Sequence, residues 1–150
     1  MAVLAENRKL KFEYEILETF EAGIELLGFE VKSLRQKGVN LAATYVLITE
    51  KAEAFWIGAK ILPYQPNNIY VEYNPQRDRK LLLKKKEINY LLGKTQEKSL
   101  TLMPFMLYTK RGFIKMELAL VRGKKKHDKR ESIKKREVDR KIKSEMKSRG

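Results

Sequence analysis

Cysteine is absent from this 150-residue sequence, and histidine occurs once, at position 127. The absence of cysteine excludes disulfides, thiolate metal ligands and a cysteine nucleophile. His127 lies in a basic segment, where no neighbouring residues have the spacing of metal ligands. General acid–base catalysis most often uses histidine or a carboxylate in a pocket. We therefore expect a protein that is not an enzyme and that carries no metal ion or other cofactor.

Long apolar runs and nucleotide-binding glycine patterns are also missing. No stretch of 18 apolar residues occurs, so we expect no membrane span and no membrane partner. Residues 1–6 lack the charged and then apolar segments of a secretory signal, which favours a cytoplasmic location. No Walker-type or dinucleotide motif is present, so nucleotide hydrolysis is not indicated. A nuclease would cleave RNA as the pure protein, and no clustered carboxylates support that class.

What the sequence does contain is a large positive charge at one end. The formal net charge is +14, and residues 122–150 hold 14 of the 33 basic but only five of the 19 acidic side chains. Residues 1–121 have an ordinary charge balance and enough apolar residues to fill one core. We therefore predict a folded domain over residues 1–121 and a basic tail over residues 122–150. Such charge asymmetry predicts a polyanionic partner.

Charge alone leaves two interpretations of the tail open. It is either a solvated, solubilising segment or a segment that binds phosphates through counterion release. Val138, Ile142 and Met146 recur every four residues, which would place them on one side of a helix. That stripe is too narrow for a core and lacks the bulky apolar residues of a membrane-binding helix. We expect the tail to be disordered alone and helical on an anionic partner.

Periodic apolar residues predict a mainly β domain with two helices. The expected strands, recognised by alternation or by β-rich composition, cover residues 12–16, 22–26, 45–49, 54–59, 100–108 and 113–121. Helical spacing predicts helices over residues 28–38 and 84–92, ended by Gly38 and Gly93. Residues 63–75 contain prolines and asparagines and are predicted to form a loop.

Six short strands favour a closed barrel, because closure removes exposed sheet edges. The predicted fold is an OB-type six-stranded antiparallel barrel with packed helices, followed by the basic tail. Pro104 predicts an edge or a bulge. In the last strand, residues 114, 116, 118 and 120 are expected to be buried and the alternate residues solvated. OB-type barrels bind single-stranded or structured nucleic acid on one face, which suggests the kind of polyanion.

Several polar residues of the domain could contribute to binding, but each also has an ordinary structural interpretation. Residues 77–80 and 84–86 form a second basic cluster, or simply a solvated loop and helix face. Glu21 precedes Gly23, which could mark a bulge or a close backbone approach. An isolated glutamate on a strand, however, most often faces solvent. Trp56 and the tyrosines could stack on bases, but most are expected in the core.

A set of short motifs, taken together in their order and spacing, resembles the SmpB family of SsrA-binding proteins. The motifs are Asn7-Arg8-Lys9, Phe20-Glu21-Ala22-Gly23-Ile24, Glu30-Val31-Lys32-Ser33-Leu34-Arg35, Asn40-Leu41, Pro63-Tyr64, Arg79-Lys80-Leu81-Leu82-Leu83, Glu87-Ile88, Gly123-Lys124-Lys125 and Asp128-Lys129-Arg130. The resemblance implies an OB-type barrel in the bacterial cytoplasm that binds the tRNA-like domain of transfer-messenger RNA (tmRNA, or SsrA RNA). It further implies a C-terminal tail that enters the mRNA channel of a stalled ribosome.

The resemblance also implies which residues make these contacts. The family's tmRNA-binding positions fall on Asn7, Glu21 and Leu82. The ribosome-contacting positions of the tail fall on Gly123, Lys124, Lys125, His127, Asp128, Lys129 and Arg130. Through the charged tmRNA, the resemblance implies elongation factor Tu as a further partner. The sequence departs from the family's usual pattern at residues 42–44, 71–75 and 99–101, where no contact is implied.

The predicted function is therefore that of a non-enzymatic RNA-binding adaptor. It would deliver tmRNA to stalled ribosomes for trans-translation, with the tail probing the empty decoding site and mRNA channel. The alternative is a ribosomal or ribosome-assembly protein that binds rRNA through barrel and tail. A rescue factor should co-purify with tmRNA and leave intact translating ribosomes. A ribosomal protein should remain on salt-washed subunits.

Overall fold

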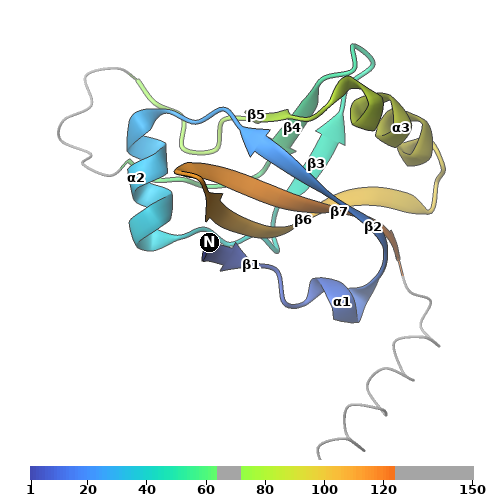
Figure 1. The fold of residues 1–150 in the computed structure, drawn as a ribbon, viewed down its shortest axis with the longest axis horizontal. Helices are drawn as coiled ribbons and strands as arrows, with labels where there is room; N and C mark the ends of the chain where they lie inside the picture. The colour runs from blue at the N-terminus through green and yellow to red at the C-terminus, as the bar shows by residue number, and fades with distance from the viewer. Residues whose placement is uncertain (64–71, 124–150) are drawn as a thin grey trace, which may run out of the picture.

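The computed structural model describes residues 1–63 and 72–123 of the chain (Figure 1). In these residues it contains seven strands and three helices. The elements in chain order are β1 (Ala2–Glu6), α1 (Leu10–Glu13), β2 (Tyr14–Ile24), α2 (Gly28–Lys37), β3 (Tyr45–Ile48), β4 (Ala54–Ile57), β5 (Arg79–Leu82), α3 (Lys85–Thr95), β6 (Leu100–Lys110) and β7 (Phe113–Gly123). No helix in this part of the chain is both long enough and apolar enough to cross a membrane.

Antiparallel pairing closes six of the seven strands into a ring. The order is β6-β3-β4-β5-β2-β7, and β7 pairs back onto β6. The β3–β6 link rests on one residue pair, Val46 with Leu102, whereas β2–β7 and β6–β7 pair along most of their lengths. β1 lies outside the ring and pairs with β6. The predicted mainly β, six-stranded antiparallel fold is thus confirmed, although β5 was not among the predicted strands, and β1 is an additional strand.

The barrel interior is apolar and organised around Trp56, which is fully buried. The indole Nε1–H of Trp56 donates to Thr44 Oγ1 at 3.0 Å, and the Thr44 hydroxyl donates to the Leu41 carbonyl at 2.8 Å. The indole nitrogen of Trp56 therefore has a hydrogen-bond partner, as a buried indole requires. The prediction that Trp56 belongs to the core is confirmed.

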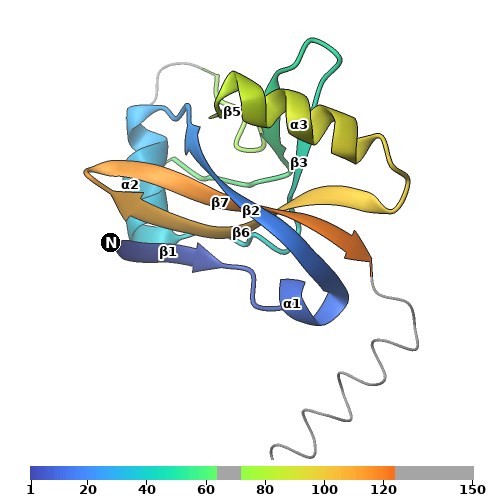
Figure 2. The same ribbon diagram turned by 45° about the vertical axis from the view of Figure 1, so that its right-hand side comes forward.

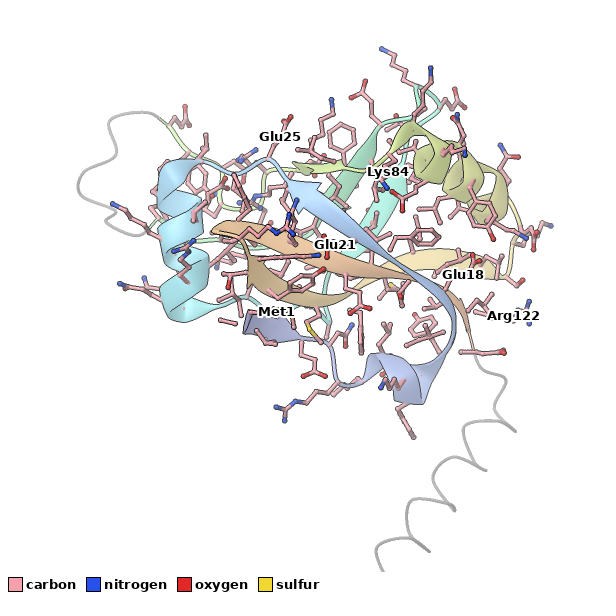
Figure 3. All side chains as sticks on the ribbon, in the orientation of Figure 1. Met1, Glu18, Glu21, Glu25, Lys84 and Arg122 are labelled. Carbon is pink, nitrogen blue, oxygen red and sulfur yellow. The ribbon has the colours of Figure 1, made fainter. Side chains whose placement is uncertain are left out.

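The two longer helices lie at opposite ends of the barrel (Figures 1 and 2). α2 buries Glu30, Ser33 and Leu34, and α3 buries Leu91 while it contacts β3 and β6. The short α1 places Leu10 against Ala119 and Val121 of β7, on the outer side of the barrel wall. Apart from the part of β7 that α1 covers, no helix lies over the outer face of β2 and of the β6–β7 hairpin (Figure 3).

A buried ion pair fixes α2 to the barrel. Glu30 and Arg79 both have fully buried side chains, and Arg79 Nη2 lies 2.7 Å from Glu30 Oε2. The Glu30 carboxylate also pairs with Arg77 and accepts hydrogen bonds from the Tyr73 hydroxyl and the Leu27 N–H. Burial alone would raise the pKa of Glu30, but these donors outweigh it and lower the pKa to about 2. Glu30 is therefore ionised at neutral pH.

The remaining donors of Arg79 are also satisfied. Its Nη1 donates to the Ala59 carbonyl at 2.6 Å and its Nη2 to the Pro75 carbonyl at 2.9 Å. Burial, followed by the hydrogen bond to Glu30, raises the pKa of Tyr73 to about 12. A buried charge pair is retained only when its other polar atoms are hydrogen-bonded, and that condition is met here.

Several predicted boundaries were wrong. The two strands expected at residues 12–16 and 22–26 are one strand, β2, and Phe12 lies before it in α1. A register shift between Ile16 and Glu18, followed by exposed residues, interrupts the apolar alternation without ending the strand. Gly93 does not end its helix, because α3 continues to Thr95, whose hydroxyl donates to the Leu91 carbonyl.

The prediction for the last strand was right on one face and partly wrong on the other. Residues 114, 116, 118 and 120 are buried as expected. Ala119 and Val121 on the opposite face are also fully buried, because Leu10 of α1 covers them. Of the edge or bulge predicted at Pro104, the structure shows the bulge, since the β6–β7 register shifts between Pro104 and Met106.

Candidate nucleic-acid interface

The structure brings two of the three predicted tmRNA-binding residues together around Gly23. Gly23 of β2 pairs with Leu82 of β5, and Glu21 lies two residues earlier on β2. A Cβ at position 23 would lie 3.3 Å from Leu82 Cβ and 3.6 Å from Lys115 Nζ. Gly23 therefore marks a close approach, one of the two interpretations that the sequence allowed. The role of Glu21 and Leu82 as RNA contacts stays a prediction.

Asn7 lies apart from this pair and is buried, with 5% of its surface exposed. Its backbone N–H donates to the Phe105 carbonyl at 2.8 Å, and its side-chain Nδ2 reaches the Pro104 carbonyl at 3.5 Å. Its own carbonyl accepts from the Leu10 N–H. These bonds join the β1–α1 connection to the bulged part of β6, so Asn7 has a structural role besides its predicted RNA contact.

Glu21 is held by two side chains from β6, which reach it across β7, the strand that pairs with both β2 and β6. The Tyr108 hydroxyl donates to Glu21 Oε2, and Lys110 Nζ lies 3.3 Å from the same oxygen. Figure 3 shows Glu21 on the uncovered face of β2, between Glu18 and Glu25. The hydrogen bond from Tyr108, and then the bond and charge of Lys110, lower the pKa of Glu21. The carboxylate is therefore ionised and fixed in position, yet exposed.

Tyr108 is the rigid partner in this arrangement. It is only 6% exposed, and burial together with the bond to Glu21 raises the pKa of its hydroxyl. Tyr108 and Glu21 are 87 residues apart in the sequence. No local pattern could have indicated their contact, and sequence reasoning missed both Tyr108 and Lys110.

An open hollow lies next to Gly23. Its floor and rim include the exposed apolar side chains of Leu27, Leu82 and Phe113, and its volume is about 650 Å³. Its charged lining consists of Lys115, of Arg77, which is paired with Glu30, and of the acidic Glu25. A hollow that combines apolar surface with cations suits a nucleobase next to a phosphate.

The second predicted basic cluster, at residues 77–80 and 84–86, is divided by the fold. Arg79 is fully buried against Glu30, and Arg77 pairs with the same carboxylate, so neither is a simple solvated cation. Lys84, Lys85 and Lys86 are exposed at the start of α3, as the solvated interpretation expected.

Most predicted residues of the tail lie outside the described residues. Gly123 is the exception: it is the last residue of β7 and pairs with Tyr14. The others are Lys124, Lys125, His127, Asp128, Lys129 and Arg130. Within residues 1–63 and 72–123, no group of three or more histidine or acidic side chains could hold a metal ion.

Comparisons with known proteins show what this chain is similar to. The family model described as SmpB protein matches residues 4–148. The SsrA-binding protein of Nostoc punctiforme is 49% identical over 146 residues, which cover 97% of this chain and 94% of that protein. The SsrA-binding protein of Mesoplasma florum is 52% identical over 139 residues, which cover 93% of each chain.

A solved structure is similar as well. A chain in the structure described as "tmRNA-SmpB: a journey to the center of the bacterial ribosome" superposes with a TM-score of 0.67 and 42% sequence identity. The match covers 89% of this chain and 95% of that chain. The similarity therefore extends over both the sequence and the fold.

Proposed function

The chain belongs to the SmpB protein family, and from this we propose that it binds tmRNA and delivers it to stalled ribosomes for trans-translation. The observation that carries the proposal is the family match over residues 4–148, which includes both the barrel and the basic tail. The similar solved chain comes from a structure of tmRNA and SmpB on the bacterial ribosome, which supports both partners. The alternative, a resident ribosomal protein, is not favoured.

In this function the barrel supplies the tmRNA contact. The ionised carboxylate of Glu21, the apolar hollow beside Leu82 and the surrounding cations offer an acceptor, a stacking surface and phosphate ligands. The acceptor suits the amino and 2′-hydroxyl donors of a folded RNA. We propose that the protein acts as an adaptor without catalytic activity, in the cytoplasm.

The tail supplies the ribosome contact in this proposal. Its positive charge suits the phosphate-lined decoding site and mRNA channel of the small subunit, where no codon–anticodon duplex is present on a stalled ribosome. Elongation factor Tu would join through the charged tmRNA. The direct test is to purify the protein from its host and to sequence the RNA bound to it. Recovery of tmRNA supports the adaptor, whereas retention on salt-washed subunits would support the resident ribosomal protein.

Glu21→Lys is expected to weaken binding to tmRNA by about tenfold to a hundredfold, because a charged hydrogen bond at the interface is lost. Added positive charge by itself would strengthen RNA binding. A loss of affinity therefore separates a specific contact from general attraction. Gel-shift titration with the tRNA-like domain of tmRNA measures the change.

Glu50→Lys is the matched control for Glu21→Lys. Glu50 is exposed in the β3–β4 turn, so the substitution makes the same charge change away from the candidate interface. Its affinity should equal or slightly exceed that of the wild type. Equal affinities for Glu21→Lys and Glu50→Lys would remove the role assigned to Glu21.

The order of residues in the tail is expected to matter as well as its charge. His127→Ala and Val138→Pro should each lower tagging of a message without a stop codon and leave free tmRNA binding nearly unchanged. The first substitution removes a ring that can stack on a base, and the second breaks the helix that would order on the ribosome. A shuffle of residues 123–146 that preserves charge is the control. Counterion release ignores residue order, so full tagging by the shuffled protein would show that charge alone is sufficient.

A further inference from the structure

The tip of the β6–β7 hairpin is a rigid, positively charged projection. Lys110 pairs with Phe113, and the two residues between them, Arg111 and Gly112, have φ angles of 52° and 83°. Two consecutive positive φ angles are typical of the tight type I′ hairpin turn. Arg35 of α2 donates from Nη2 to the Gly112 carbonyl at 3.2 Å and so attaches the tip to the helix beside it (Figure 2).

Arg111 occupies a backbone conformation that arginine adopts at a cost. Asparagine, aspartate and glycine are the residues that favour this turn position, and other side chains are strained there. The Arg111 side chain is exposed at the tip. Strain of this kind is enriched at binding sites, although Ala52 in the β3–β4 turn also has a positive φ, of 59°.

Phe113 is 69% exposed, more than any other aromatic side chain in the described part of the chain. It lines two depressions of the surface. One is the apolar hollow that also includes Leu27 and Leu82, and the other is a smaller depression whose lining includes the charged residues Glu21 and Arg111. Lys115 lines both depressions. An exposed aromatic ring between an apolar floor and several cations is a typical platform for an unstacked base.

We propose that Phe113 stacks on one unpaired base of the tRNA-like domain of tmRNA, with Arg111 and Lys115 binding the flanking phosphates. The base would enter the apolar hollow, and its polar edge would lie toward Glu21. The inference rests on the proposed function and adds a second element, the hairpin tip, to the predicted contacts at Glu21 and Leu82. The hairpin's preformed geometry means that little chain entropy is lost when the RNA binds.

The test uses the full-length protein in salt titrations with two RNA partners, the isolated tRNA-like domain of tmRNA and stalled ribosomes. Phe113→Ala should lower affinity for the tRNA-like domain about tenfold, as loss of one stacked base does, and should leave the salt slope unchanged. Arg111→Asn should lower the slope of log K against log salt by about one, because one phosphate contact is lost. Its melting temperature should equal or exceed that of the wild type, since asparagine suits the turn.

Two further variants keep the result interpretable. Phe113→Tyr retains an aromatic ring and should retain affinity. Leu47→Ala removes an exposed apolar side chain from β3 and should have no effect. Unchanged affinity in Phe113→Ala, or a loss confined to the ribosome, would overturn the proposal. So would equal losses in Phe113→Ala and Phe113→Tyr. If the wild-type protein itself fails to bind the tRNA-like domain, the proposed function fails instead.

Discussion

Glu30→Gln is expected to lower the free energy of unfolding by about 3–5 kcal/mol, because it leaves the Arg79 guanidinium charged and buried without its partner. Arg79 Nη2 lies 2.7 Å from Glu30 Oε2, and neither side chain is exposed. The substitution keeps the size of the side chain, so the effect comes from charge and not from a cavity. Urea denaturation followed by circular dichroism measures it. Adding Arg79→Met to Glu30→Gln should recover part of the loss, since no unpaired cation remains.

The matched control is the exposed pair of Arg122 and Glu15. These side chains approach to 3.8 Å but are 49% and 58% exposed. Pairs of this kind contribute about 0–1 kcal/mol, so Glu15→Gln should hardly change the urea midpoint. A similar small effect for Glu30→Gln would show that Glu30 does not anchor α2.

The same carboxylate predicts a pH dependence of stability. The folded protein lowers the pKa of Glu30 from 4.5 to about 2, so the stabilisation is fully present above the unfolded value. It is lost as the pH falls from about 4.5 to about 2, and the shift corresponds to about 3 kcal/mol. The wild-type protein should therefore lose more stability over this interval than Glu30→Gln. If the free energy of unfolding changed with pH in the same way in both proteins, Glu30 would not be the source of this pH dependence.

Removal of the tail is the second change for which we expect a large effect. A chain truncated after Gly123 should bind tmRNA with near wild-type affinity and lose tagging of a message that lacks a stop codon. The cut is placed after Gly123 because β7 extends to that residue, where it pairs with Tyr14. A cut after Val121 would remove this pair and the pairs of Arg122 with Glu15 and Leu100.

The truncated protein needs two controls. Its melting temperature should match that of the full-length protein, which shows that the barrel folds without the tail. A second cut, after Val121, should lower the melting temperature through the lost strand pairs, and so separates damage to the barrel from loss of the tail. Full tagging by the Gly123 truncation would refute the division of function between barrel and tail.

The sequence by itself determined the family, the mainly β class and the position of the charge. Alternation or β-rich composition located β3, β4, β6 and β7, and helical spacing with Gly38 located α2, because these patterns depend on neighbours a few residues apart. The order of short motifs indicated the family before any fold was known. The concentration of basic residues after residue 121 needed only the sequence.

Tertiary structure decided which residues meet. β2 is one strand because it pairs with β7 and then β5 across the interrupted alternation. Arg79 belonged to a basic cluster in the sequence but is buried, because Glu30, 49 residues away, supplies the charge that makes its burial tolerable. Tyr108 meets Glu21 only because β2 and β6 both pair with β7, one on each side of it. The register of such distant strands depends on burial summed over the whole barrel, which no short window of sequence contains.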